Sequence, residues 1–547
     1  MTPEKNYYTL FQFLSLLLLP FALFWNLGIT AVHADEATRA LISLEMIFSN
    51  DYLCPTINGE YYYNKPPLYN WILVSFIRFF GFSEFVLRLP SVLSLLGFSM
   101  SLYFFVKKNT NEKQAFYTSV GLICCARILF YDSFHGLIDL TFSWITFLSF
   151  IFLYEAFQKK QYWFLFLSTY LLMSIGFLMK GLPSLVFQAI SLISFFSYHK
   201  KLRLLFSPAH WVSACISLLI VSTYYFFYFQ ENTDLYTYFN TLINESSKRT
   251  IFMEQGNLDP FIKDRFWNTI IYMLSFPFFL LSIMLPWGLL SFSFLRKDFF
   301  KIIRSNPFLC YSALLFAVNI IVYWLSPVTK ARYLFMLFPF VLILLFHFYD
   351  ISKHKVLLHK YLKVTLYLLP IFSFSPLLVP KLTLIPRANL WVMSSIFCTI
   401  SLLLIYLQHK SHYQHLLMAV IIFFLSTRIF FNLTALPERL QTNYESITTR
   451  VQGKKLGQIT KGKKVYRIGT KVSRSPYYLN HDISMYATWE RQEIIPMKAK
   501  ADNKKDMYIV TQEQLEENEF MILYDFETRY EREKTHHENK RFLVRLK

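Results

Sequence analysis

"LFQFLSLLLLPFALFWNLGITAV", residues 10–32, decides the class of this protein, because an apolar run of this length is long enough to cross a bilayer. It is followed at once by "HADEATRA", residues 33–40, which brings Asp35, Glu36 and Arg39 to the expected lipid boundary. Helix ends at that depth are more often anchored by Trp, Tyr and scattered Lys. The charged stretch is therefore the first candidate for a functional loop.

The composition excludes a water-soluble globular protein. Of the 547 residues, 54% are hydrophobic, 19% aromatic and only 16% charged, which predicts a polytopic membrane protein. The net charge of +20 does not indicate nucleic acid as a partner, since Lys and Arg lie mainly in short tracts between apolar runs and near the C-terminus. Five of the six Cys lie inside apolar runs, so the sequence predicts no disulfide framework.

Apolar segments of suitable length predict about thirteen transmembrane helices. They lie near 8–30, 84–106, 115–131, 139–157, 161–178, 182–198, 210–229, 268–295, 307–326, 332–349, 363–380, 389–408 and 414–432. Alternate connections such as "KKNTNEK", "HKKLR" and "RKDFFKIIR" are basic and are expected in the cytoplasm by the positive-inside rule. The remaining loops are then extracytoplasmic.

The first outer loop is expected to run from about 31 to 83 and to contain two juxtamembrane helices. Residues 67–80 are apolar but too short to span, and counting them as a span would place the basic loops outside. The other helix, "DEATRALISLEMIFS", has apolar residues at helical spacing, with Asp35, Glu36 and Arg39 expected to point away from them.

The long apolar runs of the sequence end before Pro437. Residues 438–459 are predicted to form an amphipathic helix, and "KKVYRIGT", "DMYIVT", "FMILYDF" and "RFLVRLK" are predicted to form strands. We therefore expect residues 1–436 to form the transmembrane domain and residues 437–547 a small α/β domain. An odd number of spans that starts inside places this domain outside the cytoplasm.

Polar residues at the outer ends of the predicted spans are the candidates for chemistry. Carboxylates that face several cations at a bilayer surface suit a substrate with an anionic head group and a lipid tail. Each candidate also has a structural interpretation: Asp35, Glu36 and Asp139 as helix caps, Arg39 as an i,i+4 partner of Asp35, and Lys65, Lys330 and Arg332 as flanking cations. His33 and His135 are expected to be structural.

Six stretches together resemble the 4-amino-4-deoxy-L-arabinose lipid A transferase group. They are "HADEATRALISLEM", "NGEYYYNKPPLYNWI", "GFSEFVLRLPS", "LIDLTF", "LMKGLPSLVF" and "KARYLFMLFPF", in this order. More broadly, the chain resembles membrane glycosyltransferases of GT-C type, including the protein O-mannosyltransferases. Where that group has Asp-Glu-Ala-Arg-Tyr this chain has "DEATR", and Asn64 replaces the usual Glu before Lys-Pro-Pro.

The resemblance implies a GT-C fold and transfer of a sugar from a polyprenyl-phosphate donor to a lipid, glycan or protein acceptor. With one essential carboxylate we expect direct displacement with inversion. The resemblance also implies an enzyme of the bacterial inner membrane with a periplasmic C-terminal domain. Asp35, with Glu36 and Asp139, takes the catalytic position. The donor phosphate is bound by Lys65 and by residues at the Arg-Tyr-Leu motif. In this chain these are Lys330, Arg332 and Tyr333. Arg39 and Tyr62 are further substrate-binding candidates.

The sequence assigns no cofactor, since no Cys/His cluster has metal-ligand spacing, and it leaves a divalent metal open. A lipid-linked sugar polymerase, ligase or flippase would bind similar substrates. A transporter would place ionisable residues at mid-membrane on related halves, and no repeat is evident.

Overall fold

The computed structural model describes residues 3–32, 35–247, 262–326, 329–352, 355–378, 387–411, 415–437, 444–468, 481–498, 500–516, 519–527 and 540–547. The chain divides into two compact units. The first consists of Met1–Leu27, Ser91–Tyr225 and Tyr236–Glu438, and the second of Gly28–Pro90, Phe226–Leu235 and Arg439–Lys547. The second unit thus combines most of the predicted first outer loop with the C-terminal segment.

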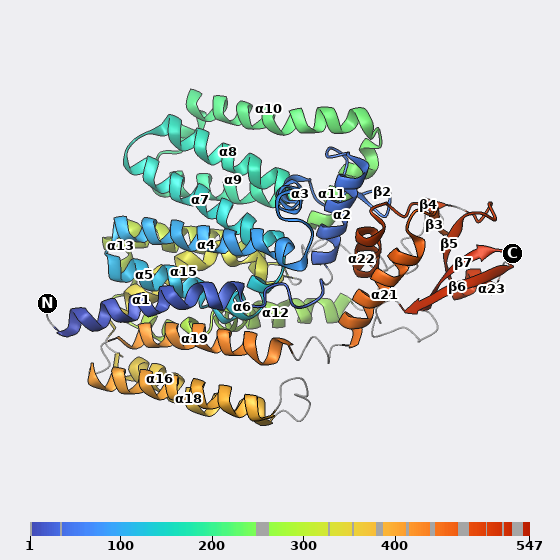
Figure 1. The fold of residues 1–547 in the computed structure, drawn as a ribbon. Helices are drawn as coiled ribbons and strands as arrows, with labels where there is room; N and C mark the ends of the chain where they lie inside the picture. Colours follow the sequence, from blue (N-terminus) through green and yellow to red (C-terminus); the bar gives the residue numbers. More distant parts are fainter. Residues whose placement is uncertain are drawn as a thin grey trace. The chain divides into compact units, whose positions relative to one another are not determined.

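The first unit is helical, and its long helices run side by side in Figure 1. The α-helices that lie in it or enter it are α1 (Pro3–Phe24), α4 (Glu84–Asn109), α5 (Glu112–Ile123), α6 (Ala126–Phe130), α7 (Ile138–Gln158), α8 (Tyr162–Lys180), α9 (Leu182–Tyr198), α10 (Pro208–Glu231), α11 (Leu235–Ser247), α12 (Ile262–Ile283), α13 (Phe299–Ser305), α14 (Pro307–Trp324), α15 (Phe338–Asp350), α16 (Lys355–Tyr367), α17 (Leu369–Phe372), α18 (Arg387–Lys410) and α19 (Leu416–Leu433). Short 3₁₀ helices include η1 (Asp132–Phe134), η3 (Trp287–Phe294), η4 (Ala331–Tyr333) and η5 (Phe335–Leu337).

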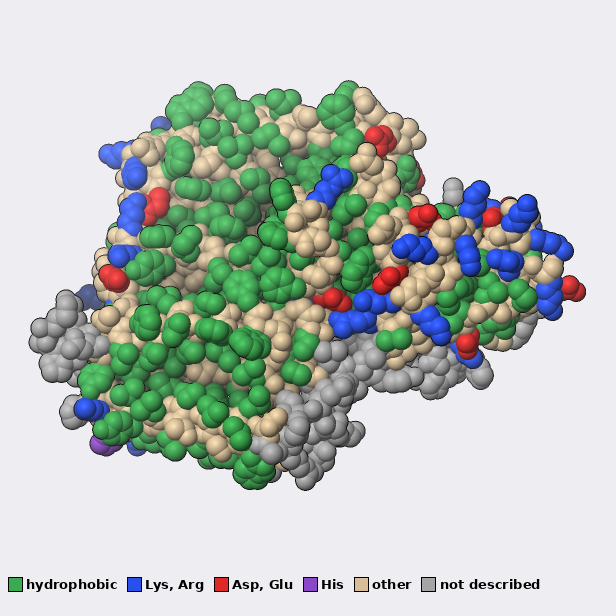
Figure 2. All heavy atoms as spheres, in the orientation of Figure 1, with side chains coloured by type: hydrophobic (Ala, Val, Ile, Leu, Met, Phe, Trp, Pro, Cys, Tyr) green, Lys and Arg blue, Asp and Glu red, His purple; other side chains and the backbone are tan. Residues whose placement is uncertain are grey.

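Hydrophobic side chains dominate the visible face of the helical unit in Figure 2. Eight described helices are long and apolar enough to cross a membrane, and the number rises to 11 if each of three bent pairs is one span. The protein is therefore a multi-pass membrane protein, as predicted. The expected total of about thirteen spans stays a prediction. The segment 67–80 forms α3 (Leu68–Phe80), a 13-residue helix that is shorter than a span.

Helices α1 and α19 pack in parallel. Phe11 contacts His415 near their beginnings, with ring centroids 5.9 Å apart. Further along, the Asn432 amide donates to the Ala22 carbonyl (3.1 Å), and Asn26 donates to the Asn432 carbonyl (2.9 Å). Both helices would cross a membrane in the same direction. If α1 and α19 are the first and last spans, the total number of spans is therefore odd.

In the second unit, the first outer loop forms α2 (Asp35–Ser49), the hairpin β1 (Thr56–Ile57) and β2 (Glu60–Tyr61), and α3. Asn58 and Gly59, both with positive φ, form the hairpin turn, which favours these residue types. The turn N–H groups of Asn58 (2.5 Å) and Gly59 (3.1 Å) donate to the carboxylate of Glu45. Glu45 thereby ties the hairpin to α2, and burial raises the pKa of its carboxyl.

The expected polar face of α2 was wrong for two of its three residues. Glu36 is 1% exposed and Arg39 is 7% exposed, so both are buried together with the apolar residues of the helix. Helix α2 packs against α3 on one side and against α22 (His481–Arg491) on another. Glu36 and Arg39 were expected to point away from the apolar residues because a hydropathy pattern does not show that their hydrogen-bonding and ion-pair partners lie on other segments of the chain.

The C-terminal segment forms a five-stranded sheet in the order β4-β3-β5-β7-β6. The strands are β3 (Val465–Ile468), β4 (Met497–Lys498), β5 (Met507–Thr511), β6 (Phe520–Glu527) and β7 (Lys540–Leu546), and the short helix α23 spans Gln512–Glu516. The four predicted strands are confirmed, whereas the two-residue β4 is too short to predict. Strands β3, β4 and β5 are parallel, and β6 and β7 are antiparallel to their neighbours.

Helices α21 (Tyr444–Thr460) and α22 cover one face of this sheet. Successive residues of β5 alternate between the two apolar clusters, with Ile509 in the cluster beneath the helices and Tyr508 in the other. The two helices approach closely at Gly457, where an added Cβ would lie 2.7 Å from the Ala487 carbonyl oxygen. The predicted amphipathic helix is thus present from Tyr444, and residues 438–443 lie outside the described part of the chain.

Candidate functional site

The predicted site residues fall into two groups, one in each unit. Asp139, Lys330, Arg332 and Tyr333 lie in the first unit. The second unit contains Asp35, Glu36, Arg39, Tyr62 and Lys65.

In the first unit, Asp139 is the centre of a buried ion-pair cluster. Its Oδ1 lies 2.6 Å from the Nζ of Lys180, and its Oδ2 lies 3.2 Å from the Nε of Arg332. Asp139 is 3% exposed and Lys180 is 7% exposed, so both charges are removed from water. Two cations around one carboxylate leave a net positive charge in an apolar setting, which favours a further anionic group nearby.

Aromatic rings hold Lys180 in place. Its Nζ lies 4.6 Å from the ring centroid of Tyr333 and 4.7 Å from that of Phe142. Tyr333 comes from η4 and Phe142 from α7, so the lysine is clamped between two elements. Lys330, predicted for the same site, is exposed at the start of η4.

The capping interpretation of Asp139 was wrong. Helix α7 begins at Ile138, its N-cap residue is Leu137, and no side chain caps it. Asp139 lies in the first turn, where a carboxylate also gains from the helix dipole. Its main partners are nonetheless the two cations from α8 and η4, neither of which is close to it in sequence.

In the second unit, Arg39 and Tyr62, both candidates for substrate binding, are in direct contact. The guanidinium of Arg39 donates to the Tyr62 hydroxyl and lies 4.9 Å from the centroid of its ring. A second nitrogen of Arg39 donates to the Asn70 amide oxygen on α3 (3.2 Å). Asn70 in turn donates to the Arg39 carbonyl (2.9 Å), so α2 and α3 are locked together at this point.

Lys65 is half-buried and is followed by Pro66 and Pro67. A residue before proline is restricted to extended backbone, and proline fixes its own φ, so the chain direction at Lys65 is narrowly set. Pro67 is the N-cap residue of α3. The Lys-Pro-Pro motif therefore gives Lys65 a fixed position relative to Asn70 and its partner Arg39.

Asp35 is exposed at the first turn of α2, and the preceding His33 lies outside the described residues. Three residues later, the Oγ1 of Thr38 lies 2.8 Å from the Nδ1 of His481 on α22. Burial lowers the pKa of His481 below its ordinary value, with Asp35 among the charges that oppose this shift. The C-terminal segment thus places the His481 imidazole beside the turn that carries Asp35.

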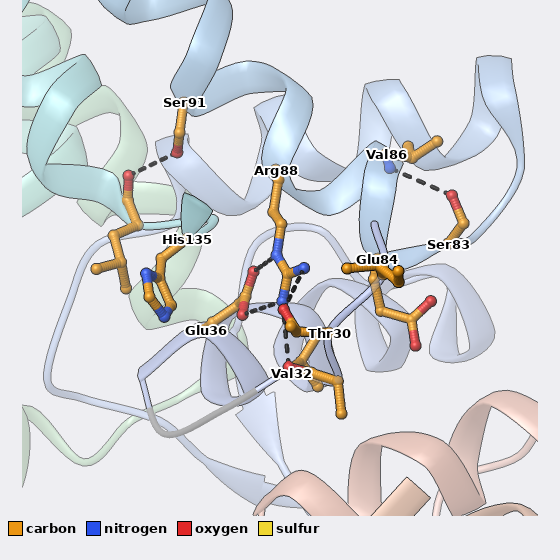
Figure 3. Close-up of polar contacts among 12 residues, drawn as sticks. Thr30, Val32, Glu36, Ser83, Glu84, Val86, Arg88, Ser91 and His135 are labelled. Atoms are coloured by element: carbon orange, nitrogen blue, oxygen red, sulfur yellow. Dashed lines mark hydrogen bonds and ion pairs between the residues drawn. The ribbon is translucent and has the colours of Figure 1, made fainter. Parts of the chain in front are cut away.

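Glu36 forms a two-point ion pair with Arg88 of α4 (Figure 3). The distances are 2.7 Å from Nε to Oε1 and 3.0 Å from Nη2 to Oε2. Arg88 also donates to the Thr30 hydroxyl (3.0 Å) and to the Ala31 carbonyl (3.1 Å). Since both oxygens of Glu36 face this guanidinium, the geometry gives Glu36 a positioning part at the start of α2.

Four residues of these clusters were not identified as site residues from the sequence: Lys180, Arg88, Asn70 and His481. Lys180 and Arg88 lie inside motifs that were quoted for the resemblance, so the motifs themselves were the available signal. Asn70 also lies inside a quoted motif, "NGEYYYNKPPLYNWI", whereas His481 had no such signal, because a single His has many structural uses. His135, expected to be structural, lies 2.8 Å from the Tyr131 carbonyl through its Nδ1.

Comparison with known proteins agrees with the predicted resemblance. A profile of the dolichyl-phosphate-mannose-protein mannosyltransferase family matches residues 64–227. The chain is 27% identical over 207 residues to the undecaprenyl phosphate-alpha-4-amino-4-deoxy-L-arabinose arabinosyl transferase of Shewanella sediminis, which covers 37% of this chain and 36% of that protein. The chain spans less than half the length of the curated relatives that it matches.

Solved structures extend the likeness over nearly the whole chain. ArnT from Cupriavidus metallidurans bound to undecaprenyl phosphate has a TM-score of 0.65, with 17% identity and 98% of each chain covered. The apo form of the same protein has a TM-score of 0.63, with 14% identity over 99% of this chain and 98% of that one. The predicted resemblance to GT-C type membrane glycosyltransferases is therefore confirmed, and the chain has the ArnT fold.

The Glu36–Arg88 pair generates a stability prediction. Replacing Arg88→Met leaves a carboxylate that is 1% exposed without its cation, which should lower the free energy of unfolding by about 3–5 kcal/mol. The double variant Glu36→Gln with Arg88→Met should recover part of the loss, because no charge is then left unpaired. Thermal unfolding of purified protein in detergent measures both.

The control is Arg78→Met on α3, where the arginine is exposed and contacts Tyr52. It should change stability by less than about 1 kcal/mol, as for most surface substitutions. Equal losses for Arg78→Met and Arg88→Met would contradict the anchoring part given to the buried pair.

Proposed function

We propose that this protein transfers a sugar from a polyprenyl-phosphate-linked donor to an acceptor on the extracytoplasmic side of the membrane. The observation that carries the proposal is the buried Asp139–Lys180–Arg332 cluster, in which two cations exceed one carboxylate at the ends of apolar helices. Such a site suits a phosphate group on a lipid tail. The names of the ArnT relatives, which specify an undecaprenyl phosphate sugar, support the same substrate class.

The chemistry follows from where charge develops. When the glycosyl bond breaks, negative charge grows on the departing polyprenyl phosphate, and cations stabilise it more in the transition state than in the ground state. We assign this part to Lys65 and Arg332, with Lys180 ion-paired to Asp139 beside Arg332. Lys330 and Tyr333 flank Arg332 in η4 and complete the proposed phosphate site.

Asp35 is the proposed catalytic carboxylate, with Glu36 and Arg39 holding the turn on which it lies. If the acceptor is a hydroxyl, Asp35 takes its proton as a general base, whereas an ionised phosphate acceptor needs Asp35 only for positioning. One essential carboxylate favours direct displacement with inversion, since retention needs a second carboxylate close to the sugar.

The proposed location is the inner membrane, with the C-terminal sheet in the periplasm. The parallel packing of α1 and α19 supports this side, because an odd number of spans places the chain after α19 opposite the N-terminus. A lipid A-like lipid is the proposed acceptor, because the motifs of this chain resemble those of the 4-amino-4-deoxy-L-arabinose lipid A transferase group.

Transfer by the purified protein tests the function directly. Protein in lipid vesicles with a radiolabelled polyprenyl-phosphate sugar and a lipid A acceptor should move label to the acceptor, one sugar at a time. Release of a ladder of labelled products would favour a polymerase instead. Movement of the labelled lipid between leaflets without any transfer would favour a flippase.

The phosphate-binding cations generate the next prediction. Lys65→Ala and Arg332→Ala should each lower transfer by about 10²–10³-fold, as for loss of one group that stabilises an oxyanion. The control is Lys159→Ala, which removes an exposed lysine at the opposite end of α7 from Asp139 and should leave transfer unchanged. Near-normal transfer in both Lys65→Ala and Arg332→Ala would remove the phosphate-site assignment.

Asp35→Asn separates catalysis from helix capping. It keeps the size of the side chain but removes its charge and basicity, so transfer should fall by about 10²–10⁴-fold. Donor affinity and thermal stability should change little, because Asp35 is exposed. Asn serves helix N-termini about as well as Asp, so the capping interpretation instead requires a variant that is both stable and active.

A further inference from the structure

Three potential metal ligands from distant parts of the sequence meet in the second unit. Asp51 and Cys54 lie in the loop after α2, and Glu231 is the last residue of α10. The ligand atoms of the three side chains, two carboxylate oxygens and the Cys54 Sγ, all lie within 4.8 Å of one another. No other group of three His, Cys, Asp or Glu with this closeness occurs among the described residues.

The loop that carries Asp51 and Cys54 has a defined local structure. The Oδ1 of Asp51 accepts hydrogen bonds from the backbone N–H groups of Leu53 (2.8 Å) and Cys54 (3.1 Å). These bonds close a tight turn and hold the Cys54 side chain at a fixed distance from the carboxylate. Cys54 is 2% exposed, so its thiol faces the protein interior.

The end of α10 is fixed against the same loop. The Cys54 thiol donates to the Tyr228 carbonyl oxygen at 3.7 Å. The Asn232 amide donates to the hydroxyl groups of Tyr63 (3.3 Å) and Tyr228 (3.1 Å). Glu231 lies between these two anchoring residues, so its backbone position relative to Cys54 is set by contacts that do not involve its own carboxylate.

The electrostatic surroundings favour a cation. Asp51 and Glu231 bring two carboxylates close to the Cys54 thiol. Within the described part of the chain, no Lys or Arg forms an ion pair with Asp51 or Glu231. Among the described residues, the negative charge of the cluster is therefore not neutralised by an ion pair.

We propose that Asp51, Cys54 and Glu231 bind one Zn²⁺ ion, through the Sγ of Cys54 and one oxygen of each carboxylate. Sulfur and oxygen ligands together suit Zn²⁺, whereas Ca²⁺ and Mg²⁺ take oxygen ligands. Zinc lies about 2.3 Å from sulfur and about 2.0–2.2 Å from oxygen, so the three atoms move slightly inward around it. Water completes the tetrahedron, and the thiol proton passes to solvent as the Zn–S bond forms.

The expected consequence is local order in the first outer loop. The ion joins the loop after α2 to the end of α10, and the hairpin that follows Cys54 leads directly to Tyr62 and Lys65. The site is separate from the proposed phosphate and catalytic residues and does not depend on the proposed reaction.

The test uses the full-length protein without a polyhistidine tag. Elemental analysis should find one zinc per chain, and substitution with Co²⁺ should give the near-ultraviolet absorption of a thiolate–cobalt bond. Cys54→Ser should abolish this band and lower Zn²⁺ affinity by about 100-fold or more, since even outer-shell partners of metal ligands contribute about 10–100-fold. Asp51→Asn and Glu231→Gln should keep the band but each lower affinity by at least about 10-fold.

The matched control is Cys215→Ser, which removes an exposed thiol of α10 in the first unit and should leave metal binding unchanged. The proposal is overturned if wild-type protein shows no thiolate band, or if Asp51→Asn and Glu231→Gln both bind as tightly as wild type. Glu231 is exposed, so Glu231→Gln should fold normally, and its Zn²⁺ affinity tests the proposal even if Cys54→Ser fails to fold. Sugar transfer is not measured, so failure here is distinct from failure of the proposed function.

Discussion

A charge removed from water must be neutralised close by, and this constraint organises the polar parts of the structure. In the first unit it gathers Lys180 and Arg332 around Asp139, and in the second it joins Glu36 to Arg88. Each arrangement links elements that are distant in sequence. Because an isolated buried charge costs several kcal/mol, these contacts also restrict which alternative packings of the helices are allowed.

The same constraint explains what the sequence could and could not reveal. Long apolar runs and alternating strands report on local burial, so the helices of the first unit and strands β3, β5, β6 and β7 were predictable. Burial of Glu36 and Arg39 was not, because it depends on Arg88 and Asn70, which approach only in the folded chain. Asp139 was identified as a candidate, but its partner Lys180 was left as part of a motif.

The site residues show a similar division. Arg39 and Tyr62 were assigned together and are in contact, and Arg332 lies beside Asp139. The proximity of His481 to Thr38 was invisible, since more than four hundred residues separate them and His481 belongs to none of the quoted motifs. Residues 28–90 and 439–547 belong to one unit, which the sequence did not predict. They are joined by contacts such as the hydrogen bond from the Val32 N–H to the Tyr486 hydroxyl (3.1 Å), and such contacts leave no signal in the hydropathy pattern.

The composition of the second unit has a consequence for biosynthesis. Its N-terminal part is made before most helices of the first unit and its C-terminal part after them. Until α22 has been synthesised, Gly28–Pro90 lacks the residues against which α2 packs, including Tyr486 and His481. The nascent first loop must therefore wait in an incompletely folded state for most of synthesis. A chain released before Arg439 would keep its membrane helices but would have no means of completing the loop that carries Asp35.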